Sequence, residues 1–82
     1  MQIEFKPGYH EWNLWINNEP VFSFGNIFEN IPTPGFDDEE ADDFADNLIE
    51  IWKMDASEND RTIDVETLRN VKSVIKDVLL AL

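Results

Sequence analysis

The residues with the greatest potential for chemistry form a run of carboxylates between positions 37 and 50. Carboxylates bind divalent cations, act as general acids and bases, or bind basic groups of another protein. Acid–base catalysis needs paired carboxyls in a cleft with separated pKa values, and an exposed run provides no such environment. We therefore expect this segment to bind a partner and not to catalyse a reaction. The predicted binding residues are Asp38, Glu39, Asp42, Asp43, Asp46 and Glu50.

A second pattern of oxygen ligands lies in residues 55 to 66, between two predicted helices. Side-chain oxygens stand at its first, third, fifth and twelfth positions: Asp55, Ser57, Asn59 and Glu66. This spacing resembles the calcium-binding loop of the EF-hand family over these twelve residues. The sixth position, Gly in that family, is Asp60, and the eighth, a branched apolar residue there, is Thr62. A divalent-cation-responsive module is thus one alternative, and a polar turn before a helix capped by Asp64 is another.

The composition favours a protein partner with a basic surface. Eighteen acidic residues against six Lys and Arg give a net charge of −12, which repels nucleic acid and anionic membranes and steers the chain toward positive surfaces. The absence of cysteine excludes disulfides, thiolate metal sites and a Cys nucleophile. We expect no cofactor, no signal peptide, no membrane span and a cytoplasmic location.

The elements that position these residues begin with three predicted strands, at residues 2 to 6, 9 to 17 and 21 to 24. Apolar and polar residues alternate within them, as in half-buried strands. Pro7 with Gly8, and Asn17 with Asn18, are typical of the turns between strands. The first 25 residues therefore predict an antiparallel meander.

Trp15 interrupts the polar face of the second predicted strand, whose apolar face His10 continues. An exposed Trp beside Tyr9 would suit a protein interface, whereas a Trp covered by a helix edge or a loop would serve packing. A structural or assembly subunit that oligomerises through Trp15 and residues 79 to 82 is a further alternative.

Two amphipathic helices follow a linker at residues 26 to 36, which we expect to close one end of the core. The acidic segment has apolar residues three and four apart, begins with Asp37 or Asp38 as its cap, and is expected to end near Met54. The last helix is expected at residues 65 to 82. Its polar side carries Arg69, Lys72 and Lys76, which an antiparallel arrangement of the helices places near the acids.

These features predict one α+β domain over residues 1 to 82, with a three-stranded antiparallel β-meander followed by two helices packed on one face. The expected core is Ile3, Phe5, Trp12, Leu14, Ile16, Phe22, Phe24, Phe44, Leu48, Ile51, Trp52, Leu68, Val71, Ile75, Val78 and Leu79. We expect a non-enzymatic acidic protein-binding domain, with partner-binding residues on the acidic helix and at Trp15. Inhibitor, immunity and anti-defence proteins of similar size and charge occupy basic, nucleic-acid-binding surfaces, some by mimicking the phosphates of DNA.

Overall fold

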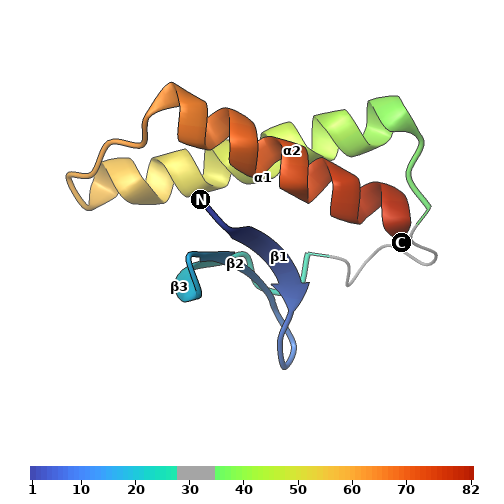
Figure 1. Cartoon of the computed structure of the whole chain (residues 1–82), viewed down its shortest axis with the longest axis horizontal. Coiled ribbons are helices and arrows are strands. Elements are labelled where there is room, and N and C mark those ends of the chain that lie inside the picture. Colours follow the sequence, from blue (N-terminus) through green and yellow to red (C-terminus); the bar gives the residue numbers. More distant parts are fainter. Residues whose placement is uncertain (28–34) are drawn as a thin grey trace.

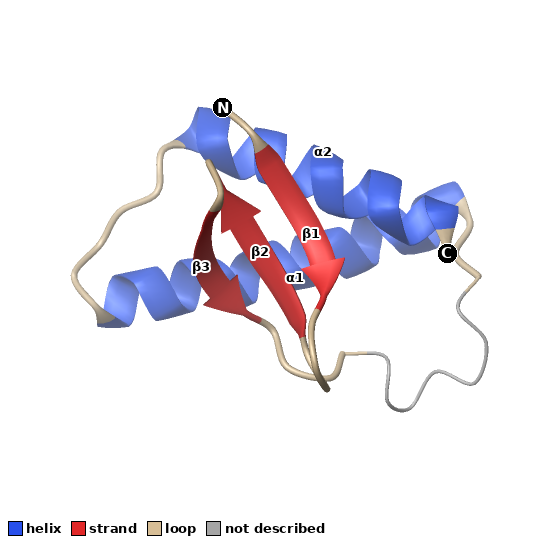
Figure 2. Ribbon diagram, turned by 60° about the horizontal axis from the view of Figure 1, so that its bottom comes forward, coloured by secondary structure: helices blue, strands red, loops and turns tan. Residues whose placement is uncertain are grey.

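Three strands and two helices form two layers in the computed structural model, which describes residues 1–27 and 35–82. Strands β1 (Ile3–Pro7), β2 (Trp12–Ile16) and β3 (Glu19–Ser23) precede helices α1 (Asp38–Glu58) and α2 (Val65–Ala81). The strands form one antiparallel sheet in the order β1-β2-β3. Both helices cover the same face of this sheet (Figures 1 and 2). The predicted α+β fold is confirmed.

The first hairpin differs from the prediction in the start of its second strand. Pro7 pairs with Trp12, so the four residues between them form the turn, closed by a 2.7 Å hydrogen bond from the Gly8 N–H to the Glu11 carbonyl. His10 has a left-handed backbone with φ of 64°. It therefore lies in this turn and does not continue the apolar face of β2, because a left-handed residue cannot keep the strand pleat.

The second hairpin turns on Asn17 and Asn18, whose φ angles of 53° and 66° suit a tight two-residue turn. β3 begins two residues before the predicted strand and includes Pro20. The pairing with β2 shifts at Val21, which leaves one extra residue there. A bulge and a Pro that lacks an N–H both discourage another strand from pairing with this edge.

The core lies between the sheet and the helices. Its buried members are Phe5, Leu14, Ala41, Ala45, Leu48, Ile49, Trp52, Val71, Ile75 and Leu79. Ile51, expected in this core, is 47% exposed, whereas Ile49 is only 7% exposed. Ile49 lies seven residues after Asp42, on the side of α1 that contacts α2, and Ile51 lies on the other side. The buried face of α1 is therefore turned toward α2.

Most of the linker that was predicted to close one end of the core, residues 28–34, lies outside the described residues. Ile27 and Phe36, on either side of that segment, pack against the core. The ring of Phe36 lies 5.3 Å from the ring of Phe44, centroid to centroid.

Capping residues fix where both helices begin. Asp37 accepts a 2.8 Å hydrogen bond from the Glu40 N–H, and the Glu40 carboxylate accepts one from the Asp37 N–H, which forms a capping box. Asp64 caps α2, as predicted, by accepting hydrogen bonds from the N–H and the hydroxyl of Thr67. The hydrogen bonds from Thr67 lower the pKa of Asp64.

α1 ends at Glu58, four residues later than expected. Ala56 is buried, so the last turns of the helix still pack against the core. The N–H of Arg61 reaches back 2.7 Å to the Ala56 carbonyl around a left-handed Asp60, a common way for a helix to end. Asp usually marks turns, which is why the sequence alone suggests an earlier end.

Candidate functional site

The acids of α1 fall into two sets, and the first set faces α2. Asp38, Asp42 and Asp46 recur at four-residue spacing along the side of α1 that contacts α2. The Lys72 ammonium lies 2.8 Å from Asp46 and 3.2 Å from Asp42. The Lys76 ammonium lies 3.2 Å from Asp38 and 3.5 Å from Asp42. The expectation that the two helices bring their acidic and basic side chains together is confirmed for Lys72 and Lys76, whereas no ion pair of Arg69 is found among the described residues.

These contacts shift the protonation equilibria of the groups that make them. The hydrogen bond from Lys72 lowers the pKa of Asp42. The hydrogen bond to Asp46 raises the pKa of Lys72, and the one to Asp38 raises the pKa of Lys76. All five side chains remain partly exposed, so solvent and salt weaken their attraction. Three of the predicted binding acids, Asp38, Asp42 and Asp46, are thus already paired with lysines of α2.

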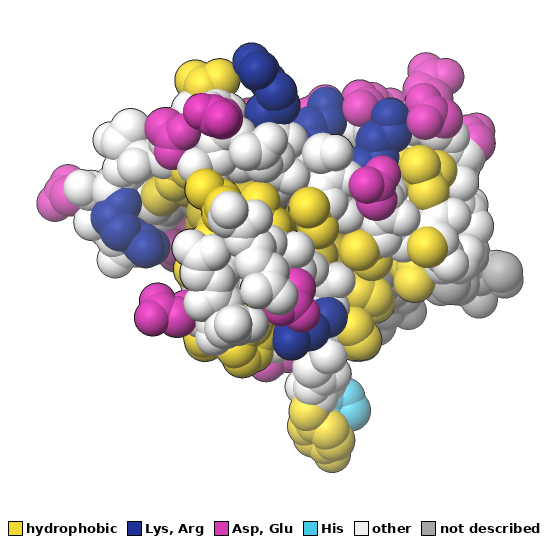
Figure 3. Space-filling model, viewed as in Figure 1, with side chains coloured by type: hydrophobic (Ala, Val, Ile, Leu, Met, Phe, Trp, Pro, Cys, Tyr) yellow, Lys and Arg dark blue, Asp and Glu magenta, His cyan; other side chains and the backbone are white. Residues whose placement is uncertain are grey.

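The second set of acids points away from α2. Glu39, Asp43 and Glu50 follow one another at helical spacing on the solvent side of α1, and Asp46, about half exposed, lies beside them. Glu50 forms an exposed ion pair of 3.3 Å with Lys53. Within the part of the chain that the structure describes, no ion pair reaches Glu39 or Asp43. Figure 3 shows acidic and basic side chains along the edge that the helices form.

One group of carboxylates is dense enough to hold a cation. Oxygens of Asp42, Asp43 and Asp46 lie within 4.8 Å of one another. The Lys72 ammonium already contacts two of these three carboxylates. Positive charge from α2 therefore already lies against Asp42 and Asp46, and among the described residues Asp43 forms no ion pair.

The EF-hand-like ligands are not gathered in a loop, which corrects the expectation for residues 55 to 66. Asp55 and Ser57 lie in the last turns of α1, and Glu66 lies in the first turn of α2. The Asn59 side-chain amide donates a hydrogen bond to the Asp55 carbonyl, and the Asp55 carboxylate binds Arg61 at 3.2 Å. A calcium loop must wrap its ligands around the ion, and a helical segment cannot do so.

Trp15 lies on the face of the sheet that the helices leave open. Its neighbours along β2, Leu14 and Ile16, point toward the helices, so Trp15 points away from them. The Lys6 ammonium lies 4.6 Å from the centre of the Trp15 ring, and this contact partly covers the ring. The predicted set of partner-binding residues therefore divides into two surfaces, one on α1 and one on the opposite layer.

The hairpin turn between β1 and β2 projects beyond the body of the molecule (Figures 1 and 3). Tyr9 in this turn is 88% exposed. Its ring contacts the ring of His10, with the centroids 4.2 Å apart.

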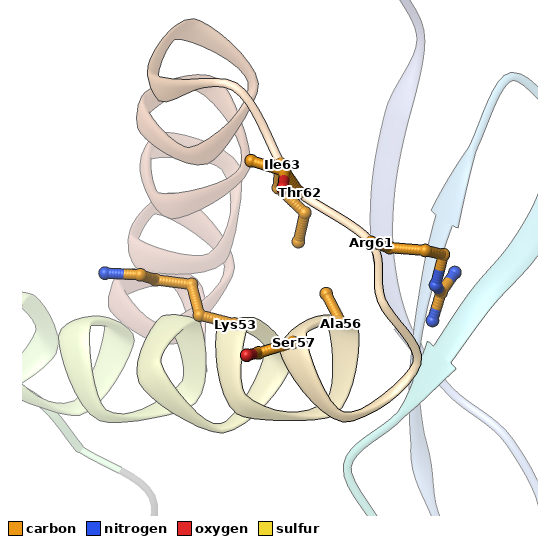
Figure 4. Close-up of a pocket in the computed structure, with 6 residues that line it drawn as sticks. All are labelled: Lys53, Ala56, Ser57, Arg61, Thr62 and Ile63. Atoms are coloured by element: carbon orange, nitrogen blue, oxygen red, sulfur yellow. The ribbon is translucent and has the colours of Figure 1, made fainter.

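Two shallow cavities lie beside the connection between α1 and α2, and sequence reasoning missed both. One of about 220 Å³ is lined by Lys53, Ala56, Ser57, Arg61, Thr62 and Ile63. Figure 4 shows the charged ends of Lys53 and Arg61 pointing in opposite directions, away from the space between Ala56 and Thr62. The other, of about 250 Å³, reaches Trp52 and the sheet. Its one carboxylate, Asp64, caps α2. The polar groups do not converge on a point where a substrate could react.

Comparisons with protein families, with curated proteins and with solved structures found no match to this chain. Among residues 1–27 and 35–82, no helix combines the length and the apolar character needed to cross a membrane.

Proposed function

We propose that the solvent side of α1 binds a basic surface of a partner protein, without catalysis. The observation that carries this proposal is the row of exposed carboxylates formed by Glu39, Asp43 and Glu50, beside which lies Asp46, half exposed and paired with Lys72. With a net charge of −12, such a row attracts positive surfaces and accelerates association with them. Asp38 and Asp42 contribute mainly by holding α1 against α2 through Lys72 and Lys76.

The chain would act by occupying the basic surface, as an inhibitor, immunity or anti-defence protein does. Capping at Asp37 and packing against α2 hold the helix in one conformation before binding, which lowers the entropy cost of association. Mimicry of DNA phosphates has less support than ordinary protein recognition. Lys72 and Lys76 place positive charge among the carboxylates of α1, where a duplex has none.

Two variants with the same change in net charge test this proposal. D43K/E50K reverses the solvent side of α1, and E66K/D77K reverses two exposed acids of α2. Each is used with the wild type to capture partners from a lysate of the source organism, and the association rate of any captured partner is then measured at low and moderate salt. We expect D43K/E50K to slow association by about tenfold or more, and E66K/D77K to have a much smaller effect.

The control decides between a specific face and a general charge effect. If both variants lose partner binding equally, the acids act only through net charge and solubility, and no specific face of α1 is involved. A partner bound equally well by all three proteins would refute the role of α1 and direct attention to Trp15 on the open face of the sheet.

A further inference from the structure

The solvent side of α1 also exposes two neighbouring apolar side chains. Ile51 is 47% exposed and Met54 is 63% exposed. Their three-residue separation places them side by side on the helix. Ile51 lies nine residues after Asp42, about two and a half turns, and so on the opposite side of α1 from the lysines of α2. Among the described residues, none on this side of α1 forms an ion pair with α2.

Three carboxylates lie near this apolar pair, and one of them, Glu50, is paired with Lys53. Glu50 lies one turn before Met54, Glu58 lies one turn after it, and Asp43 lies about two turns before Ile51. All three are exposed. Single exposed apolar residues are common on protein surfaces. An apolar centre with a charged rim is, in contrast, the usual arrangement of a protein interface.

We propose that the partner docks a basic amphipathic helix on this side of α1, an inference that rests on the proposed function. The apolar face of the partner helix would cover Ile51 and Met54, and its Lys and Arg side chains would reach Asp43, Glu50 and Glu58. The surface from Asp43 to Glu58 is ~22 Å long at 1.5 Å per residue, which about four turns of a helix match. The flexible Met54 side chain can adapt to the groove between apolar residues.

The negative charge of this surface argues against other occupants. A second copy of this chain would bring carboxylates against carboxylates, and each copy carries a net charge of −12. Nucleic acid and anionic lipid are repelled for the same reason. A positively charged partner with an apolar stripe satisfies both features of the surface.

Two synthetic peptides of about 18 residues provide the test. The first has Leu on one helical face and Lys on the other, and the second has Ser in place of every Leu, so the two carry equal charge. Binding to the full chain is measured by calorimetry at about 150 mM salt, where distant charges are screened. We expect the Leu peptide to bind at least tenfold more tightly, with NMR shift changes confined to residues 43 to 58.

Two protein variants test whether Ile51 and Met54 cause the tighter binding of the Leu peptide. I51S/M54S should remove the tenfold advantage of the Leu peptide and leave the weak, salt-sensitive binding of both peptides. V65S removes an apolar residue that is 69% exposed elsewhere on the surface, and it should leave the advantage unchanged. Circular dichroism checks that each variant is folded.

The outcomes separate this inference from the function on which it rests. Equal affinity of the two peptides, or equal loss in I51S/M54S and V65S, would overturn the apolar docking site, and salt-sensitive binding would still support the acidic surface. If neither peptide binds even at low salt, both the docking site and the proposed basic partner are refuted.

Discussion

The ammonium of Lys72 lies 2.8 Å from the carboxylate of Asp46, and this contact joins the polar edges of the two helices. Lys72 also reaches Asp42, which in turn contacts Lys76. Positive charges from α2 thus alternate with negative charges from α1 along the line where the helices meet. The acidic helix therefore has one side that forms ion pairs with α2 and another that faces solvent.

We predict that Lys72→Met lowers the free energy of unfolding at neutral pH and low salt, because Asp42 and Asp46 lose their shared ammonium and repel each other. The pKa of Asp42 is lowered from its ordinary value of 3.8, so its contribution is complete above that pH and disappears as the pH falls through the lowered pKa. The pKa of Lys72 is raised from 10.5, so its contribution is complete below that pH and disappears as the pH rises through the raised pKa.

Urea denaturation of the wild type and the variant between about pH 3 and pH 11 checks this prediction. The difference between the two proteins should be largest near neutral pH, and smaller at both extremes and in about 1 M salt. A difference that is the same at every pH and salt concentration would show that the methionine changes packing and not charge.

A matched pair of substitutions on α1 measures which isoleucine belongs to the core. Ile49→Ala removes a buried side chain and should cost about 2–4 kcal/mol of unfolding free energy. Ile51→Ala removes a half-exposed side chain, so it should cost under about 1 kcal/mol. Urea denaturation of both variants gives the comparison. Similar costs at the two positions would contradict the orientation of α1 described here.

This pair also shows what the sequence can predict. Spacings of three and four residues predict the helix and most of its buried face. Leu48 and Trp52 are shared by two overlapping apolar stripes, one that includes Ile49 and one that includes Ile51. The side on which α2 packs decides between them, and no local pattern contains that information. The three strands and the turn at Asn17 and Asn18 were predictable because alternation and turn residues are local signals, whereas the start of β2 was predicted three residues too early.

The sequence predicts the candidate site about as completely as it predicts the buried face of α1. The acidic run and the basic side of the last helix are visible in the sequence, and their proximity follows only if the two helices pack antiparallel. Which acids are paired with lysine and which are free depends on the rotation of α1 about its axis. The sequence also does not show that Asp55 and Ser57 of the EF-hand-like spacing lie in α1, whose last turns bury Ala56.

The capping box at the start of α1 should contribute measurably to stability. Asp37→Ala removes the acceptor of the Glu40 N–H, and we expect a loss of about 1 kcal/mol. Asp37→Ser keeps an acceptor at this position and should retain most of the stability. Thermal unfolding followed by circular dichroism distinguishes the two variants. Equal melting temperatures for Asp37→Ala and the wild type would show that the start of α1 is held by other contacts.

The left-handed backbone of His10 leads to the last prediction. His10 has φ of 64°, a conformation that Gly adopts freely and that a β-branched residue adopts only at a cost. His10→Gly should therefore be at least as stable as the wild type, whereas His10→Val should lose about 1–2 kcal/mol. Urea denaturation of both variants measures the difference. If His10→Gly is destabilised as much as His10→Val, the contact of the His10 ring with Tyr9, and not the backbone, governs the stability of this hairpin.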